Sequence, residues 1–323
     1  MAEFQNPISP FDAPDPFMTY DADTGYYYAL FTRGKKLEIF RSKRAACVVT
    51  DGDSRVVYTP SPERDGIWGH IWAPEMHKGT NGRWYIYTSG SVTADASQKR
   101  LFIMEGPKGD PFVGDWTFKC MPTPDVFSID PTVYTAPDGA QYLCVSRLDP
   151  IDGQVLDIYD MVNPYTVGES HATIARAELE WELIPPYVGG YAIVEGAFFV
   201  EREGRLFIVY SANGCWSDDY CLGVLEHTGG LLCDAKNWKK HPRPIFTYGN
   251  GLYGPGHASF FKSPDTSELW CAYHGMKEHN EDCTPTARYF NIQKIDFDEN
   301  GFFVRALPVG YEKKQNSPSG ESD

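Results

Sequence analysis

Three acidic side chains stand in similar sequence contexts at long intervals: Asp15 in DAPDPF, Asp130 in SIDPT and Glu195 in VEGAFF. Carboxyl groups that a fold brings together raise one another's pKa, so that one can hold a proton at neutral pH while another stays ionised. General acid/base chemistry needs that pair of states. The chemistry therefore depends on a fold in which these three residues converge.

Each of these acids opens one unit of a fivefold repeat, and Trp72 and His257 open the other two. In every unit a short apolar run leads into a polar turn and then into a strongly aromatic strand, as in RWYIYTS and RLFIVYS. The five markers are separated by 57, 58, 65 and 62 residues, and each interval can hold four short strands with their loops. The turns carry the Gly, Asn, Asp and Pro that tight hairpins require.

Repeated four-stranded units are typical of a β-propeller, so we predict an all-β fold with five four-stranded blades around a central channel. The innermost strands line that channel, and the residues that begin them would meet at one end of it. Residues 1–311 contain no linker and are expected to form a single propeller domain, whereas the polar segment 312–323 is expected to be a disordered tail. A β-sandwich or two β domains would not produce a fivefold period.

Charge and composition exclude several classes of function. The 323 residues include 29 basic and 44 acidic side chains, and the net charge of −15 argues against nucleic acid and anionic membrane surfaces as partners. No apolar run is long enough to span a bilayer, and the N-terminal sequence lacks a secretory signal, so we expect a cytoplasmic protein, or a secreted one if a leader has been removed. The eight cysteines include no CxxC pair, which favours free thiols, although Cys215 and Cys221 could pair in an exported protein.

The five motifs, taken in order, resemble glycoside hydrolase family 43, whose members are five-bladed β-propeller enzymes. The resemblance covers about residues 6–311 and consists of DAPDPF, WAPE, SIDPT, VEGAFF and GHASF. Each motif is weak alone, but all five at this spacing are specific. The resemblance implies an inverting glycosidase that acts on α-L-arabinofuranosides or β-D-xylosides.

The resemblance also implies a role for each acid. Asp15 is expected to be the general base that activates water, Glu195 the general acid that protonates the leaving oxygen, and Asp130 the third acid that orients Glu195 and raises its pKa. Inversion needs room for water, so the base and acid carboxyls should lie about 6.5–9.5 Å apart. Asp12 is the rival base, but Asp15 has the DPF context. For Glu75 a structural role is expected.

Three further residues are candidates for substrate binding. Trp72 could stack on a sugar ring or pack between blades. Arg288 occupies a place where family members often carry a sugar-binding arginine, and a structural ion pair is its alternative. His257 could bind substrate as a hydrogen-bonded channel histidine, or contact a central Ca²⁺ ion through water, as related enzymes suggest. No acid-rich calcium loop is present, and no cofactor is expected to be required.

Other sequence features carry weaker signals. Trp68 and His70 could stand at the pocket rim. His274, His279 and Cys283 match a zinc site poorly and are expected to be ordinary surface or rim residues. The glycine-rich loop from Gly249 lacks the phosphate-binding pattern, and no GxSxG elbow is present.

The sequence thus predicts an inverting, exo-acting α-L-arabinofuranosidase whose partners are arabinose- or xylose-containing oligosaccharides. A β-D-xylosidase is the alternative within the family. A non-catalytic glycan-binding propeller is the alternative outside enzymes, and the presence of all three acids argues against it.

Overall fold

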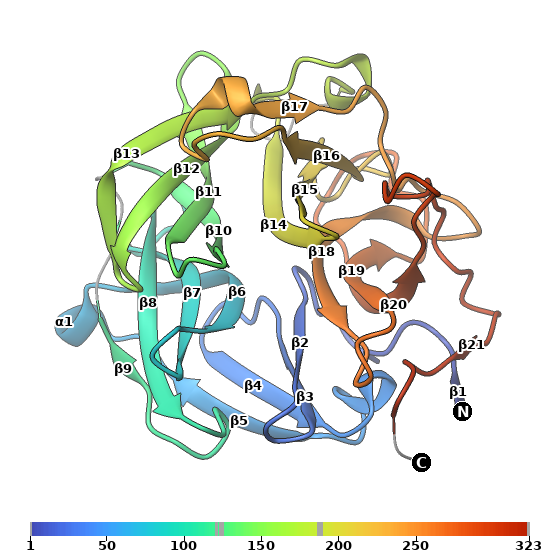
Figure 1. The fold of residues 1–323 in the computed structure, drawn as a ribbon, viewed down its shortest axis with the longest axis horizontal. Coiled ribbons are helices and arrows are strands. Elements are labelled where there is room, and N and C mark those ends of the chain that lie inside the picture. Colours follow the sequence, from blue (N-terminus) through green and yellow to red (C-terminus); the bar gives the residue numbers. More distant parts are fainter. Residues whose placement is uncertain (1, 120–121, 123–125, 186–189, 322–323) are drawn as a thin grey trace.

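The computed structural model of the chain describes residues 2–119, 122, 126–185 and 190–321. Five antiparallel sheets surround a common centre, in chain order from blue to orange (Figure 1). This confirms the predicted all-β, five-bladed propeller. Four sheets have four strands in sequential order, and the fifth has three.

The first blade contains β2 (Phe17–Asp21), β3 (Tyr26–Leu30), β4 (Leu37–Ser42) and β5 (Asp53–Tyr58). The second contains β6 (Gly69–Lys78), β7 (Arg83–Ser91), β8 (Lys99–Lys108) and β9 (Thr117–Phe118). The third contains β10 (Ser128–Thr135), β11 (Gln141–Asp149), β12 (Gly153–Asn163) and β13 (Thr166–Ala175). The fourth contains β14 (Val194–Arg202), β15 (Arg205–Ala212), β16 (Cys221–His227) and β17 (Trp238–Lys240). The fifth contains β18 (Tyr253–Lys262), β19 (Leu269–Met276) and β20 (Tyr289–Ile295). Outside the blades lie β1 (Glu3–Phe4), β21 (Gln315–Asn316), the helix α1 (Pro62–Asp65) and 3₁₀ turns at Ala45–Cys47, Glu180–Glu182 and Ala235–Asn237.

The polar turns of the sequence repeat form the hairpins between the first and second strands of the blades. Gly25, Gly82, Gly139 and Gly204 lie in these turns with φ between 68° and 89°, a backbone region that glycine enters without strain. The aromatic runs that follow become the second strands, which are largely buried. Local turn chemistry and strand composition therefore agree with the repeat.

The apolar core is divided into five clusters, one between each pair of neighbouring blades. The cluster that closes the ring joins Tyr27 and Ala29 of the first blade to Phe261 and Trp270 of the fifth. Because every blade buries both faces against its neighbours, a ring of sheets can be stable without one central core.

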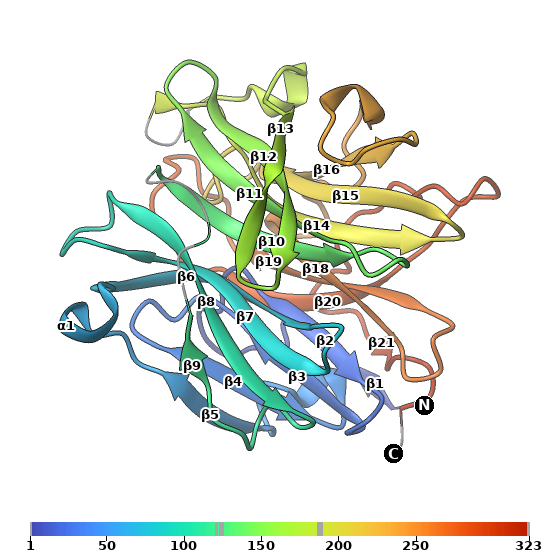
Figure 2. The same ribbon diagram turned by 60° about the vertical axis from the view of Figure 1, so that its left-hand side comes forward.

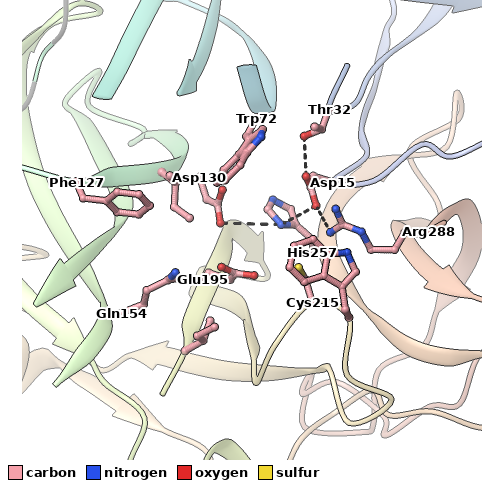
Figure 3. Close-up of a pocket in the computed structure, with 13 residues that line it drawn as sticks. Asp15, Thr32, Trp72, Phe127, Asp130, Gln154, Glu195, Cys215, His257 and Arg288 are labelled. Carbon is pink, nitrogen blue, oxygen red and sulfur yellow. Dashed lines mark hydrogen bonds and ion pairs between the residues drawn. The ribbon is translucent and has the colours of Figure 1, made fainter. Parts of the chain in front are cut away.

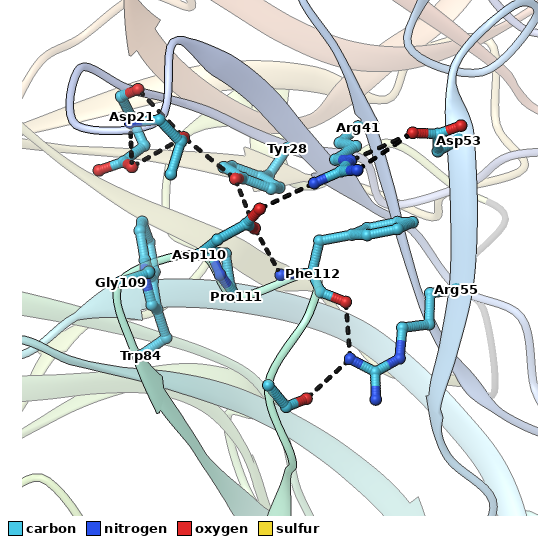
Figure 4. Close-up of polar contacts among 12 residues, drawn as sticks. Asp21, Tyr28, Arg41, Asp53, Arg55, Trp84, Gly109, Asp110, Pro111 and Phe112 are labelled. Carbon is cyan, nitrogen blue, oxygen red and sulfur yellow. Dashed lines mark hydrogen bonds and ion pairs between the residues drawn. The ribbon is translucent and has the colours of Figure 1, made fainter.

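A polar network also joins the first two blades (Figure 4). Asp110, in the loop after β8, accepts hydrogen bonds of 2.8 Å from the hydroxyl of Tyr28 and from Nη1 of Arg41. Nη1 of Arg55 donates to the carbonyls of Phe112 and Gly114 at 2.6 and 2.7 Å. These contacts fix the outer edge of the second blade against the first.

The N-terminal segment completes the fifth blade. Residues 6–13 run beside β20, where the main-chain N–H of Ile8 donates to the carbonyl of Phe290 and that of Ala13 to the carbonyl of Arg288, both at 2.8 Å. The side chain of Asn6 exchanges hydrogen bonds with both main-chain groups of Ile292. The first residues of the chain thus take the outer position of the last blade.

Of the segment 312–323, for which disorder stays a prediction, the structure describes residues 312–321. Strand β21 pairs with β1, and Oε1 of Glu321 accepts a 2.9 Å hydrogen bond from the N–H of Ala45. Both views place β1 and β21 side by side (Figures 1 and 2). The polar composition suggested disorder because it gives no sign of partners that lie far away in the sequence.

Among the described residues, no helix has the length and apolar character that crossing a membrane requires. The seven described cysteines are free, Cys215 and Cys221 included, and Cys120 lies outside the described residues.

Candidate active site

Each blade has an equivalent residue with positive φ in the first half of its inner strand or just before it. These residues are Asp15, Ala73, Asp130, Gly196 and His257, with φ between 43° and 56°. In β6, β10, β14 and β18 the pairing register with the second strand shifts at these positions, as it does at a β-bulge. Bulges re-aim side chains and often stand beside active sites. Asp15, Asp130 and His257 thus occupy equivalent positions, whereas Trp72 and Glu195 each precede the equivalent residue by one.

The side chains at these bulges meet in one pocket of about 290 Å³ at the end of the central channel (Figure 3). All six residues that the sequence singles out as site candidates line it: Asp15, Trp72, Asp130, Glu195, His257 and Arg288. The other lining residues are Thr32, Phe127, Ile129, Gln154, Ile193, Cys215 and Trp216.

Asp15 is a buried carboxylate with several donors. Oγ1 of Thr32 donates to its Oδ2 at 2.6 Å, and Nη1 of Arg288 donates to its Oδ1 at 3.1 Å. Nδ1 of His257 lies 3.4 Å from the same Oδ1. Burial would raise the pKa of Asp15, but the charge of Arg288 outweighs burial and holds the pKa well below its usual range. Asp15 is therefore ionised at neutral pH.

Glu195 and Asp130 are buried side by side and titrate together. Burial raises the pKa of Glu195 to about 7. A 2.9 Å hydrogen bond that the hydroxyl of Tyr220 donates to Oε1 acts in the opposite direction and lowers this pKa. Burial, followed by the charges of Glu195 and Asp15, raises the pKa of Asp130 well above its usual range. The N–H of Gly196 donates to Oδ2 of Asp130 at 3.1 Å, which favours the ionised form of Asp130. The two acids together can retain one proton near neutral pH.

His274 does not lie at the surface or rim, so that expectation is wrong. It is fully buried beneath Asp15, and its Nδ1 accepts a 3.1 Å hydrogen bond from the main-chain N–H of Asp15. Its ring stacks on Tyr220 with 5.3 Å between centroids. Burial and the charge of Arg288 lower its pKa to about 3, so the imidazole is neutral. His274 and Tyr220 thus connect Asp15 to Glu195 below the pocket, whereas His279 is exposed beside Asp218.

Arg288 combines the two roles that the sequence left open, because it lines the pocket and forms an ion pair with Asp15. Its main-chain N–H donates a 2.8 Å hydrogen bond to Oδ1 of Asp12. Asp12 is exposed and does not line the pocket. The rival base therefore supports Arg288 from outside.

Trp72 forms part of the pocket wall. Its carbonyl accepts a 2.7 Å hydrogen bond from Thr88, and Nζ of Lys99 lies 3.5 Å from the centroid of its ring. Trp68 and His70 are exposed and do not line the pocket. Glu75 lies farther along the same strand, where its Oε2 is 2.7 Å from Nε2 of His77.

A recurring hydroxyl at the end of the second strand fixes the bulges. Thr32 accepts from the N–H of Ala73 at 2.8 Å, in addition to its bond to Asp15. Ser146 donates to the carbonyl of Val194 at 3.0 Å, and Ser211 accepts from the N–H of His257 at 2.8 Å. Thr or Ser at the end of four of the five aromatic runs was the sequence signal that could have identified Thr32. For Cys215, Trp216 and Lys99 the sequence offered none.

Asp130, Glu195 and His257 each offer a ligand atom within 4.8 Å of the other two, so this group could hold an ion. The group fits calcium poorly, because it supplies two carboxylates and an imidazole whereas calcium takes six to eight oxygen ligands.

Comparison with known proteins decides the family. Residues 4–303 match the family model described as glycosyl hydrolases family 43. The chain belongs to this family. Among curated proteins, the chain is 32% identical over 284 residues to an extracellular exo-α-(1→5)-L-arabinofuranosidase of Streptomyces chartreusis, covering 85% of this chain and 83% of that protein. It is 28% identical to the Streptomyces avermitilis protein of the same name, covering 95% of this chain and 64% of that protein.

A solved structure agrees with this assignment to family 43. The α-L-arabinofuranosidase from Lactobacillus brevis superimposes with a TM-score of 0.86 at 26% identity, and the match covers 96% of this chain and 98% of that one. The protein is thus a family 43 glycoside hydrolase that is arabinofuranosidase-like, and membership of the family implies a glycan substrate.

Proposed function

We propose that this family 43 enzyme is an inverting, exo-acting α-L-arabinofuranosidase that hydrolyses arabino-oligosaccharides or removes arabinose side chains. The observation that carries the proposal is the opposite direction of two pKa shifts in one pocket: Asp15 is held ionised and Glu195 is raised to about 7. A carboxylate and a carboxylic acid facing one small pocket are what a single-displacement glycosidase requires.

In the proposed reaction Asp15 is the general base. Thr32 and Arg288 bind different oxygens of its carboxyl group and fix its plane. Asp15 takes a proton from a water molecule as the water oxygen forms a bond to the anomeric carbon. Because water attacks the face opposite the departing group, the configuration at that carbon inverts.

Glu195 is the proposed general acid. It transfers its proton to the glycosidic oxygen as the bond from that oxygen to the anomeric carbon breaks. Asp130 is buried beside it, and because two neighbouring carboxyl groups do not readily ionise together, the pair retains the proton that Glu195 transfers. The N–H of Gly196, the residue after Glu195, binds Asp130, so the two side chains keep a fixed relation.

Trp72, Arg288 and His257 are the proposed substrate-binding residues. Trp72 offers an aromatic surface to the apolar face of the sugar, and Arg288 offers donors to its hydroxyl groups. Burial lowers the pKa of His257, so its neutral imidazole can both donate and accept. The pocket volume, about 290 Å³, is at the small end for ligand sites and supports recognition of one terminal sugar.

The choice of arabinose rests on similarity to proteins named as arabinofuranosidases. The test is hydrolysis of 4-nitrophenyl α-L-arabinofuranoside and β-D-xylopyranoside, with ¹H NMR of the first product formed. We expect release of arabinose as the inverted anomer. Xylose release alone would replace the proposal with a β-D-xylosidase, and binding without turnover would indicate a glycan-binding propeller.

We propose that hydrolysis requires no metal or other cofactor. A channel ion would have to be coordinated largely by water near His257, and an ion bound directly to Glu195 would compete with the proton that the reaction uses. Dialysis against EDTA, followed by metal analysis and rate measurement, tests this. Loss of activity that calcium restores would contradict it.

We also propose a reducing compartment, the cytoplasm, as the location of the enzyme. The seven free cysteines support this proposal. Cell fractionation with an antibody would test it, and recovery from the culture medium would refute it.

A further inference from the structure

Lys99 is a buried amine beside the pocket that the proposed mechanism does not use. It begins β8, the third strand of the second blade, and its side chain has no solvent exposure. Its Nζ lies 3.5 Å from the centroid of the Trp72 ring and donates a hydrogen bond to the carbonyl of His70. Burial lowers its pKa to about 7, while the charge of Asp130 favours the ammonium form. Burying an ammonium group is costly, so its two contacts need explanation.

The segment that carries Trp72 is irregular and is held by specific contacts. His70 and Ala73, on either side of Trp72, have φ of 48° and 43°, which is unfavourable for residues other than glycine. Ile71 exchanges main-chain hydrogen bonds with Gly34, and Thr32 and Thr88 bind Ala73 and Trp72. Lys99 holds the remaining carbonyl, that of His70.

Lys99 differs from these other anchors because it also touches the indole ring. An ammonium group packed on an aromatic face is attracted by the ring quadrupole, and the attraction grows when water is excluded. The ring is thus fixed from the face that Lys99 covers. Lys99 itself does not line the pocket.

We propose that Lys99 is a positioning residue that fixes Trp72 as the wall against which the terminal sugar packs, on the ring face opposite the ammonium group. The proposal rests on the proposed function of the pocket. A wall contacts the bound sugar in the ground state and in the transition state alike, so its loss should raise KM and leave kcat nearly unchanged.

The first test compares Lys99→Met with Lys108→Met, an exposed lysine at the other end of the same strand. Methionine replaces the buried charge with an apolar side chain of similar length, a change that is often neutral or stabilising for the fold. We expect KM and the inhibition constant of free arabinose to rise about tenfold in Lys99→Met, with kcat within about twofold. Lys108→Met should match the wild type. A fall in kcat at constant KM would overturn the proposal.

The second test asks whether Lys99 acts through Trp72. In a Trp72→Ala background, Lys99→Met should cause no further rise in KM, because the contact is already absent. An equal rise in both backgrounds would refute the proposal. If Lys99→Met does not fold, Lys99→Gln replaces it, since glutamine keeps a donor and removes the charge.

A spectroscopic test needs no substrate and so separates this proposal from the proposed function. The near-UV circular dichroism difference between the wild type and Trp72→Phe reports the fixed environment of Trp72. That difference should shrink in the Lys99→Met background. An unchanged spectral difference would overturn the positioning role of Lys99. If the wild type is inactive on arabinofuranosides but the spectral difference shrinks as expected, only the proposed arabinofuranosidase function is overturned.

Discussion

The hydroxyl of Tyr220 donates a 2.9 Å hydrogen bond to Oε1 of Glu195, and the Tyr220 ring stacks on His274 beneath Asp15. This bond stabilises the ionised form of Glu195 and lowers its pKa against the effect of burial. Tyr220→Phe should therefore raise the pKa of Glu195 and move the alkaline limb of the pH–rate profile up by about one unit. Tyr210→Phe, which removes a buried hydroxyl from Glu182 instead, should leave that limb in place. An unmoved limb in Tyr220→Phe would show that another group sets it.

Removing the proposed base should abolish turnover on every substrate. Asp15→Ala is expected to reduce kcat by about 10³-fold or more, since the pKa of Asp15 is held low, whereas the pKa values of the pocket carboxyls Asp130 and Glu195 are raised. Asp12→Ala is the matched control, because Asp12 is exposed and contacts only the main chain of Arg288 among the hydrogen bonds described for its side chain. Steady-state rates on aryl arabinofuranosides decide between them. A larger loss of kcat in Asp12→Ala than in Asp15→Ala would show that Asp12, and not Asp15, is the general base.

Removing the proposed acid should depend on the leaving group. Glu195→Ala is expected to slow hydrolysis of arabino-oligosaccharides by about 10²–10⁴-fold, whereas 4-nitrophenolate departs with little need of a proton. The ratio of kcat/KM on the two substrates, compared with the wild-type ratio, measures this. Equal losses on both substrates would contradict the assignment.

The wild-type pH profile should be wide on the acid side. The pKa of Asp15 is well below its usual range, so the base stays ionised and, while the protein is folded, activity should persist at pH values where an ordinary aspartate is protonated. The alkaline limb should fall near pH 7, where Glu195 loses its proton. Asp130→Asn should lower the rate and move this limb downward, because Glu195 then no longer shares its proton with a second carboxyl group whose ionisation would repel its own. An upward movement would indicate that Asp130 does not support the proton on Glu195.

The sequence predicted the ring and the residues at its repeated positions, because those follow from local patterns. Asp15 and Asp130 each precede proline at an equivalent bulge, and the spacing of such motifs reports the blades. His274 could not be placed in this way, since its contact with Asp15 joins residues 259 positions apart and only the closed ring brings them together. Lys99 gave no signal either, because charged residues beside a turn are usually solvated and its partner lies two strands away.

The tail shows the same limit of sequence analysis. Residues 312–321 belong to a segment whose composition is typical of disorder, yet β21 pairs with β1 and Glu321 binds the main-chain N–H of Ala45. The composition of a segment indicates how much apolar surface its own residues can bury. It does not describe the hydrogen bonds that distant parts of the chain offer to it.

The closure of the fifth blade by residues 6–13 determines at which stage of synthesis and folding the active site is complete. Asp15 is synthesised 273 residues before Arg288, and the main-chain hydrogen bond between Ala13 and Arg288 brings the two side chains together. A nascent chain therefore lacks a pocket with an ionised, oriented Asp15 until the fifth blade has left the ribosome. Fraying of the N-terminal segment would silence the enzyme while four blades remain folded, so activity should decay before the circular dichroism of the sheets does.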